Sequence, residues 1–155
     1  MLTPTPTIVP TATPSATAPT ASPTPALLDD SLVITVGQAT FFAEVADNDE
    51  DRRQGLSGRA SMPENRAMWF IYDYEHVPTF WMNDMLFPLD IVWVNASFSV
   101  VDISANAPAP APGTPPSDLA LYSPRAPAQY VLEINAGMAG KFGIDIGSKV
   151  SVGIP

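Results

Sequence analysis

Apolar and polar residues alternate along several short stretches of the chain, which is the pattern of half-buried β-strands. The alternation holds over residues 31–36 and again over 41–45, with a Gly37-Gln38 turn between them, and this predicts a hairpin. Further strands are expected at 68–72, 79–82, 89–94, 98–103, 130–134 and 149–152. About eight short strands predict a mostly β fold, a compact antiparallel sandwich or barrel.

Two short stretches have helical signals instead. Asp47 followed by Glu50 has the spacing of a capping box, and it predicts a helix that runs to about Leu56 and stops at Gly58. Residues 136–142 predict one or two further helical turns. The expected fold is therefore a β domain with one or two short helices.

Proline is concentrated in two places along the chain. Of the 18 prolines, seven lie in residues 1–25 and seven in residues 106–127. Residues 1–25 also contain eight threonines and no charge, so we predict a disordered Thr/Pro-rich linker at 1–28 and one packed domain at 29–155. The second stretch predicts a long Pro-rich loop, which either covers a site or is an idle surface loop.

The linker composition also bears on localisation. Thr/Pro-rich stalks commonly separate an exported domain from an anchor, so we expect an extracytoplasmic protein, secreted or tethered to the cell surface by an envelope anchor upstream. A disordered tail without targeting meaning is the alternative. The chain starts without a basic segment followed by an apolar one and has no run of 18 apolar residues, so neither a signal peptide nor a transmembrane segment is expected in it.

Charge and residue counts exclude several kinds of site. The net charge is -9 with only seven basic residues, which argues against nucleic-acid binding. There is no cysteine, so thiolate metal sites, iron–sulfur clusters and cysteine nucleophiles are excluded. A single histidine, His76, cannot build a multi-histidine site. We therefore expect neither a metal nor a cofactor.

Five segments together resemble a known family. They are RQGLSGR at 53–59, MWF at 68–70, FWMNDMLFPLD at 80–90, YVLEINAG at 130–137 and FGIDIGSKV at 142–150. The pattern is similar to that of the DUF192 family over about residues 31–153. The resemblance implies a compact, mostly β domain of a family that is often exported and whose function is unknown, and it implies no reaction.

The chain departs from the family pattern at a few positions. Ser57 stands where the family usually has Met, Ala67 where it has Gly, and Ser148 where it has Asp. Asn83-Asp84 replaces the usual Lys-Asn, so a basic residue that the resemblance would place beside this motif is absent.

Asp90 is the first candidate for a functional residue. It lies in the predicted strand 89–94 with Val92 and Val94 on its face, and a carboxylate among apolar side chains needs a partner. We expect that partner to be Arg59, in a bidentate pair that either holds a ligand or joins the helix segment to the sheet. Loss of either member of such a buried pair would cost about 3–5 kcal/mol.

Trp81 is the second candidate. It precedes Asn83-Asp84, and an aromatic ring beside amide and carboxylate groups suits the binding of sugars and other flat, hydroxylated ligands. The alternative is that Trp81 packs in the core. Since side chains alternate along a strand, Phe80 and Met82 are expected in the core, with Trp81 on the opposite side.

Glu133 is the third candidate. It faces away from Tyr130, Leu132 and Ile134, and we expect it on the side of Asp90. A solvated edge glutamate is the alternative. The sequence thus predicts an extracytoplasmic, non-enzymatic binding module for a small-molecule, glycan or protein ligand, with no catalytic residue assigned. Its predicted site is Arg59, Trp81, Asn83, Asp90 and Glu133.

Two other functions stay open from the sequence. One is a hydrolase that acts on glycans with two carboxylates drawn from Asp84, Asp90 and Glu133. The other is a purely structural module in which the polar residues only hold the domain together. Whether the protein is an enzyme is not decided by the sequence.

Overall fold

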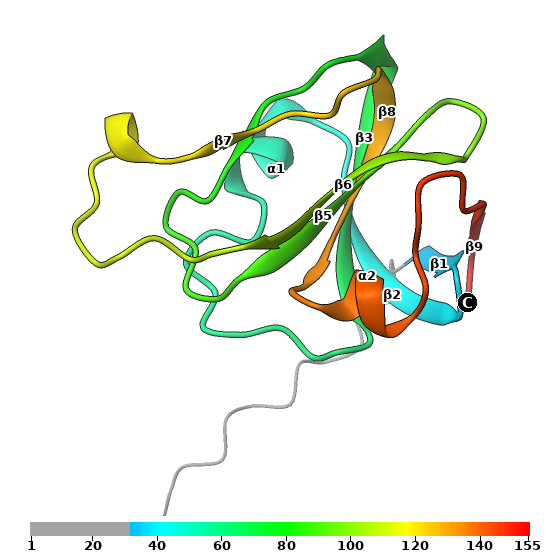
Figure 1. Cartoon of the computed structure of the whole chain (residues 1–155), viewed down its shortest axis with the longest axis horizontal. Coiled ribbons are helices and arrows are strands. Elements are labelled where there is room, and N and C mark those ends of the chain that lie inside the picture. The colour runs from blue at the N-terminus through cyan, green and yellow to red at the C-terminus, as the bar shows by residue number, and fades with distance from the viewer. Residues whose placement is uncertain (1–31) are drawn as a thin grey trace, which may run out of the picture.

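Residues 32–155 are described by a computed structural model, and their main element is one curled β-sheet (Figure 1). The expected linker at 1–28 lies outside the described residues. The strands are β1 (Leu32–Val36), β2 (Ala39–Ala46), β3 (Arg66–His76), β4 (Phe80–Trp81), β5 (Leu89–Val94), β6 (Val100–Ala107), β7 (Leu121–Tyr122), β8 (Ala128–Asn135) and β9 (Val150–Gly153). The helices are α1 (Asp49–Gln54), the 3-10 turn η1 (Pro116–Asp118) and α2 (Met138–Lys141).

The main sheet has seven strands in the order β6-β5-β8-β3-β2-β1-β9 and curls into a half-barrel. Its two edge strands approach each other at one end only. There Gly147 N–H donates to the carbonyl of Val100 at 2.8 Å, and Val150 N–H donates to that of Phe98 at 2.9 Å. The mostly β fold expected from the sequence is confirmed. One pairing differs from a purely antiparallel sheet, because β2 and β3 run parallel, connected through α1.

The two faces of the sheet bury different sets of side chains. The inner face of the curl gathers apolar residues from all seven strands, among them Ile34, Phe41, Trp69, Val92, Val100, Leu132 and Val150. The outer face of β3, β5 and β8 carries a second cluster that includes Phe70, Ile91, Trp93 and Val131. All six residues of β5 are buried because both of its faces are covered.

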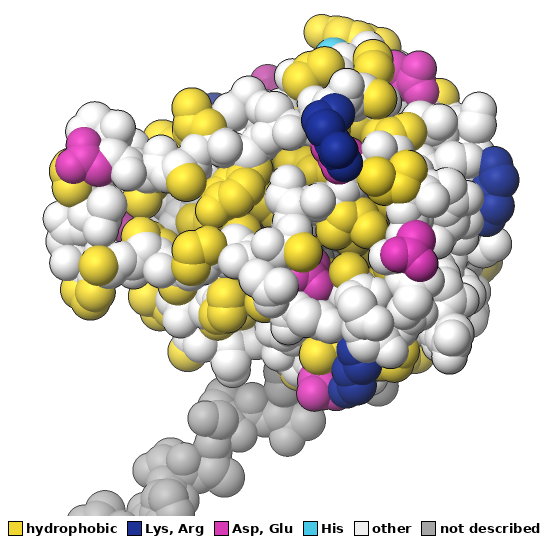
Figure 2. Space-filling view, viewed as in Figure 1, with side chains coloured by type: hydrophobic (Ala, Val, Ile, Leu, Met, Phe, Trp, Pro, Cys, Tyr) yellow, Lys and Arg dark blue, Asp and Glu magenta, His cyan; other side chains and the backbone are white. Residues whose placement is uncertain are grey.

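A two-stranded ribbon of β4 and β7 covers part of the outer face. Phe80 anchors it, with its ring edge-to-face against Phe70 and Trp93 at centroid distances of 5.0 and 5.2 Å. The chain from β6 to β8, with η1 and β7 in it, projects at one side of the domain (Figure 1). On the face drawn in Figure 2, apolar side chains gather around β6 and this projection, and basic side chains are few.

The predicted Pro-rich loop at 106–127 contains two structural features that its composition did not predict. Leu121 and Tyr122 form β7, a strand too short to show an alternating pattern. Arg125 then fixes the loop, because its guanidinium donates to both carboxylate oxygens of Asp102, at 3.0 and 2.6 Å. These hydrogen bonds lower the pKa of Asp102 to about 2. The loop is therefore attached to β6.

The helix boundaries also differ from those expected. Asn48, and not Asp47, caps α1, since its side chain accepts from the N–H groups of Glu50 and Asp51 at 3.1 and 3.0 Å. The helix ends at Gly55, where φ is 47°, and not at Gly58. The second helix lies inside the predicted range 136–142.

Within residues 32–155, no helix combines the length and the apolar character that a membrane span requires.

Candidate functional site

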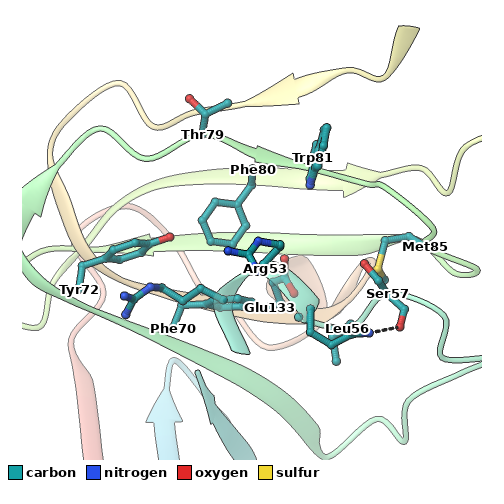
Figure 3. A pocket seen from close by; sticks show the side chains of 13 residues that line it. Arg53, Leu56, Ser57, Phe70, Tyr72, Thr79, Phe80, Trp81, Met85 and Glu133 are labelled. Atoms are coloured by element: carbon teal, nitrogen blue, oxygen red, sulfur yellow. Dashed lines mark hydrogen bonds between the residues drawn. The ribbon is translucent and has the colours of Figure 1, made fainter. Parts of the chain in front are cut away.

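A pocket opens on the outer face of the sheet, between the end of α1 and the β4 strand (Figure 3). Its volume is about 250 Å³. The residues that matter for its chemistry are Arg53, Leu56, Tyr72, Phe80, Trp81 and Glu133. In Figure 3, Phe80 and Trp81 lie along one side of the pocket, Leu56 lies on the other, and Glu133 lies between them.

Glu133 lies in β8, which pairs with both β3 and β5 in the middle of the sheet. Its register partners are Met68 and Ile91, so its side chain stands on the outer face. The residue is only 5% exposed, and no residue of the described chain donates a hydrogen bond to its carboxyl group. Its oxygens are not sealed from solvent either, and they reach the pocket. Burial raises the pKa of Glu133 to about 8, so the group is mostly a neutral acid at pH 7.

Trp81 supplies an aromatic surface at the mouth of the pocket. It is 47% exposed, whereas its neighbours Phe80 and Met82 are 7% and 3% exposed. The predicted division of this strand into two core residues and one outward tryptophan is confirmed. Trp81 lies opposite Leu121 of β7, so the ribbon pairing positions it.

Two consecutive arginines at the end of α1 line the pocket, and they differ in their contacts. Arg52 is held in place, because it donates to the carbonyls of Asp47 and Ile71 and to the carboxylate of Asp49, each at 2.7 Å. Arg53 is exposed and makes no side-chain hydrogen bond or ion pair with the residues at 32–155. Sequence reasoning missed Arg53, since two basic residues at a helix C-terminus are already explained by the helix dipole.

Comparison with known proteins assigns the domain to a family. The model of the DUF192 family, which is described as an uncharacterised ACR, matches residues 32–152. The chain belongs to the DUF192 family. No curated protein matches it.

Two solved structures are similar to this DUF192 domain. One is a protein of unknown function from Novosphingobium aromaticivorans, with 31% identity, a TM-score of 0.68 and coverage of 88% of this chain and 94% of that chain. The other, from Sinorhizobium meliloti, is described as a candidate transcription regulator, with 26% identity, a TM-score of 0.69 and coverage of 79% of this chain and 93% of that chain.

The expected pair of Asp90 with Arg59 is wrong. Asp90 is fully buried on the inner face, where its two oxygens accept the backbone N–H groups of Asn106 at 2.7 Å and Ala139 at 2.9 Å. These two donors satisfy the carboxylate without any basic side chain. Asp90 therefore joins β5 to the end of β6 and the start of α2.

Arg59 instead pairs with Glu44 of β2, donating to both carboxylate oxygens at 2.7 Å. Arg66 lies 3.7 Å from the same carboxylate. The hydrogen bonds from Arg59 hold the pKa of Glu44 below its usual value. Arg59 is a structural contact of the DUF192 domain and does not line the pocket.

We expect Arg59→Ala to lower the free energy of unfolding by only about 1 kcal/mol, because an ion pair that is partly exposed to solvent contributes little in water. This is well below the cost expected for a fully buried pair. Urea unfolding of Arg59→Ala and of its matched partner variant Glu44→Gln would measure the effect. A loss above about 3 kcal/mol in either variant would contradict a solvent-screened pair.

The carboxyl groups of Asp90 and Glu133 do not share a site. The register pairs Asp90 with Ile134 and Glu133 with Ile91, which places the two carboxyl groups on opposite faces of the sheet. The expectation that Glu133 lies on the side of Asp90 is therefore wrong. Its predicted orientation away from Leu132 is confirmed, since Leu132 belongs to the inner cluster.

Asn83 lies in a second hollow that adjoins the pocket. Asn83 and Asp84 line it together with Arg53 and Ser57, which also line the pocket. The side chains of Asn83 and Asp84 bond to each other at 3.0 Å, and the carbonyl of Asn83 accepts from the Ser57 hydroxyl at 2.8 Å. Of the five predicted site residues, the structure thus brings Trp81 and Glu133 into one pocket and places Asn83 next to it.

A metal site is not formed in the described part of the chain. No group of three or more histidine, aspartate or glutamate side chains between residues 32 and 155 is arranged to hold an ion.

The chemistry that the pocket offers is stacking on an aromatic ring, hydrogen bonding to a neutral acid and pairing with a guanidinium group.

Proposed function

We propose that this DUF192 domain is a non-enzymatic, extracytoplasmic binding module whose outer-face pocket takes a small, flat, hydroxylated ligand such as a sugar. One observation carries the proposal: the buried carboxyl group of Glu133 has no partner in the described chain and reaches a pocket whose mouth holds the half-exposed Trp81. A polar group in an apolar surrounding is stabilised when a partner arrives. A ligand hydroxyl is such a partner, and the indole ring is a stacking surface for the ligand ring.

The extracytoplasmic location is supported by composition alone. Residues 1–25 combine eight threonines and seven prolines with no charged residue, as stalks of surface domains commonly do. A domain held outside the cytoplasm meets glycans and envelope fragments, which is consistent with a sugar as ligand.

The pocket favours binding over hydrolysis of a glycan. Hydrolysis of a glycosidic bond ordinarily needs two carboxyl groups on either side of that bond. Glu133 lines the pocket, whereas Asp90 is on the other face of the sheet and Asp84 lines the adjoining hollow. The net charge of -9 and the count of only seven basic residues also argue against a regulator that binds DNA.

Titration with a panel of monosaccharides, disaccharides and peptidoglycan fragments tests the proposal, by calorimetry and by tryptophan fluorescence. Trp69 and Trp93 are buried, so Trp81 is the tryptophan that a ligand can reach. We expect Trp81→Ala and Glu133→Leu each to weaken binding about 10-fold or more, equivalent to about 1.4 kcal/mol. Ile146→Ala, an exposed residue that does not line the pocket, is the control.

Two results would contradict the binding function. The first is that no member of the panel binds the wild-type domain. The second is that a ligand binds and neither Trp81→Ala nor Glu133→Leu changes its affinity, which would place the binding elsewhere on the domain.

A further inference from the structure

We infer that the pocket selects acidic sugars, with the ligand carboxylate paired to Arg53 and a ring hydroxyl hydrogen-bonded to Glu133. This inference rests on the proposed binding function and names the class of ligand for the same pocket. Two observations support it. Arg53 has no carboxylate partner among the described residues, whereas the other arginines do, and Arg53 lines the pocket.

Arg53 differs from every other arginine of the chain. Arg52 pairs with Asp49, Arg59 and Arg66 with Glu44, and Arg125 with Asp102, all within 4.0 Å. Arg53 has no such partner among the described residues, although the chain carries more than twice as many acidic as basic residues. An arginine left unpaired in so acidic a protein is available to an anionic ligand.

Arg53 is also placed where a ligand would meet it. It comes from the last turn of α1 and lines the pocket together with Trp81 and Glu133. In Figure 3 its side chain lies between the β4 residues and Leu56. A planar guanidinium group binds a carboxylate through two parallel hydrogen bonds, and this geometry recognises a carboxylate better than a single hydroxyl.

Glu133 is compatible with an anion in the pocket. At neutral pH its buried carboxyl group is mostly protonated, so it donates a hydrogen bond to a ring oxygen or hydroxyl and does not repel a ligand carboxylate. The other titratable groups that line the pocket are Tyr72 from β3 and Arg52 and Arg53 from α1. None of these carries a negative charge at pH 7.

The size of the pocket limits the ligand further. Its volume of about 250 Å³ is below the roughly 300–1,000 Å³ of pockets that hold drug-sized molecules. One monosaccharide unit fits this volume better than a longer glycan. The expected ligand is therefore a single uronate residue, either free or at the end of a chain.

Calorimetry at pH 6.5 with matched probes tests the selectivity. The probes are D-glucuronate and D-galacturonate, compared with D-glucose and D-galactose, which lack the carboxylate. We expect at least one uronate to bind about 10-fold tighter than its neutral counterpart, and added salt to reduce the difference. Arg53→Gln should remove the preference, and Arg53→Lys should keep part of it. Arg59→Gln is the matched control, since Arg59 pairs with Glu44 away from the pocket.

The outcomes separate this inference from the function on which it rests. If neutral sugars and uronates bind equally and both lose affinity in Trp81→Ala, the sugar site stands and the selectivity for acids is overturned. The same holds if Arg53→Gln keeps the preference for uronates. If none of the four probes binds and other members of the sugar panel do, the acid selectivity alone fails. If nothing in either set binds, both proposals fail.

Discussion

Replacing Glu133 by leucine is expected to make the domain more stable above neutral pH, by up to roughly 5 kcal/mol at pH 9. Burial raises the pKa of Glu133 from 4.5 to about 8, so the native carboxyl group holds its proton more tightly than the unfolded one. Its stabilising contribution is complete below pH 4.5 and is lost as the pH rises through about 8. Leucine has no proton to lose and suits the apolar neighbours of this position.

Urea unfolding at pH 5, 7 and 9 measures the effect. The wild-type domain should lose stability across this range, and Glu133→Leu should lose much less. Glu50→Gln, at an exposed position, is the control for removing a carboxyl group elsewhere and should follow the wild type. Equal slopes for wild type and Glu133→Leu would mean that Glu133 is ionised and solvated in the folded domain.

Replacing Asp90 by alanine is expected to have the largest destabilising effect, about 3–5 kcal/mol. The carboxylate of Asp90 accepts the N–H groups of Asn106 and Ala139 in a buried position, and alanine would leave both donors without a partner. Asn106 has a positive φ of 54°, so this part of β6 depends on the hydrogen bond to keep its conformation. The same change should leave ligand affinity unaltered in the folded protein, because Asp90 faces away from the pocket.

Thermal and urea unfolding measure the loss, with two comparisons. Asp90→Asn keeps one oxygen acceptor and should be intermediate in stability. Asp118→Ala removes an exposed carboxylate and should change the free energy of unfolding by less than about 0.5 kcal/mol. If Asp90→Ala were as mild as Asp118→Ala, the two backbone donors would have found water or another acceptor.

The alternation of apolar and polar residues predicted which way the pocket residues Trp81 and Glu133 face within their strands. The alternation over residues 79–82 correctly placed Trp81 opposite Phe80 and Met82, and that over 130–134 correctly turned Glu133 away from Leu132. Neither pattern showed that Trp81 and Glu133 line the same pocket. They line the same pocket because the β4–β7 ribbon lies on the outer face of the sheet, which a two-residue strand does not reveal beforehand.

The partners of the charged residues could not be predicted from the sequence. Asp90 was correctly expected to need a partner, but its donors are backbone N–H groups, which every residue carries and which therefore leave no mark in the sequence. Arg59 reaches Glu44 because the crossover through α1 brings it to β2. Arg53 was overlooked because it stands out only by having no carboxylate partner. Which arginines have such a partner depends on the positions of all charged side chains in the folded domain.

The sequence by itself determined the mostly β class, the positions of most strands and the short helices. It also determined that Trp81 faces away from Phe80 and Met82, and that Glu133 faces away from Leu132. These properties depend on neighbours within a few residues, where the alternation of side chains and the conformational limits of proline and glycine act directly. Only the tertiary structure decided which residues share a pocket and which groups bond to Asp90, from 16 and 49 residues away. Those contacts depend on strand order and register, which are set by the packing of the whole sheet.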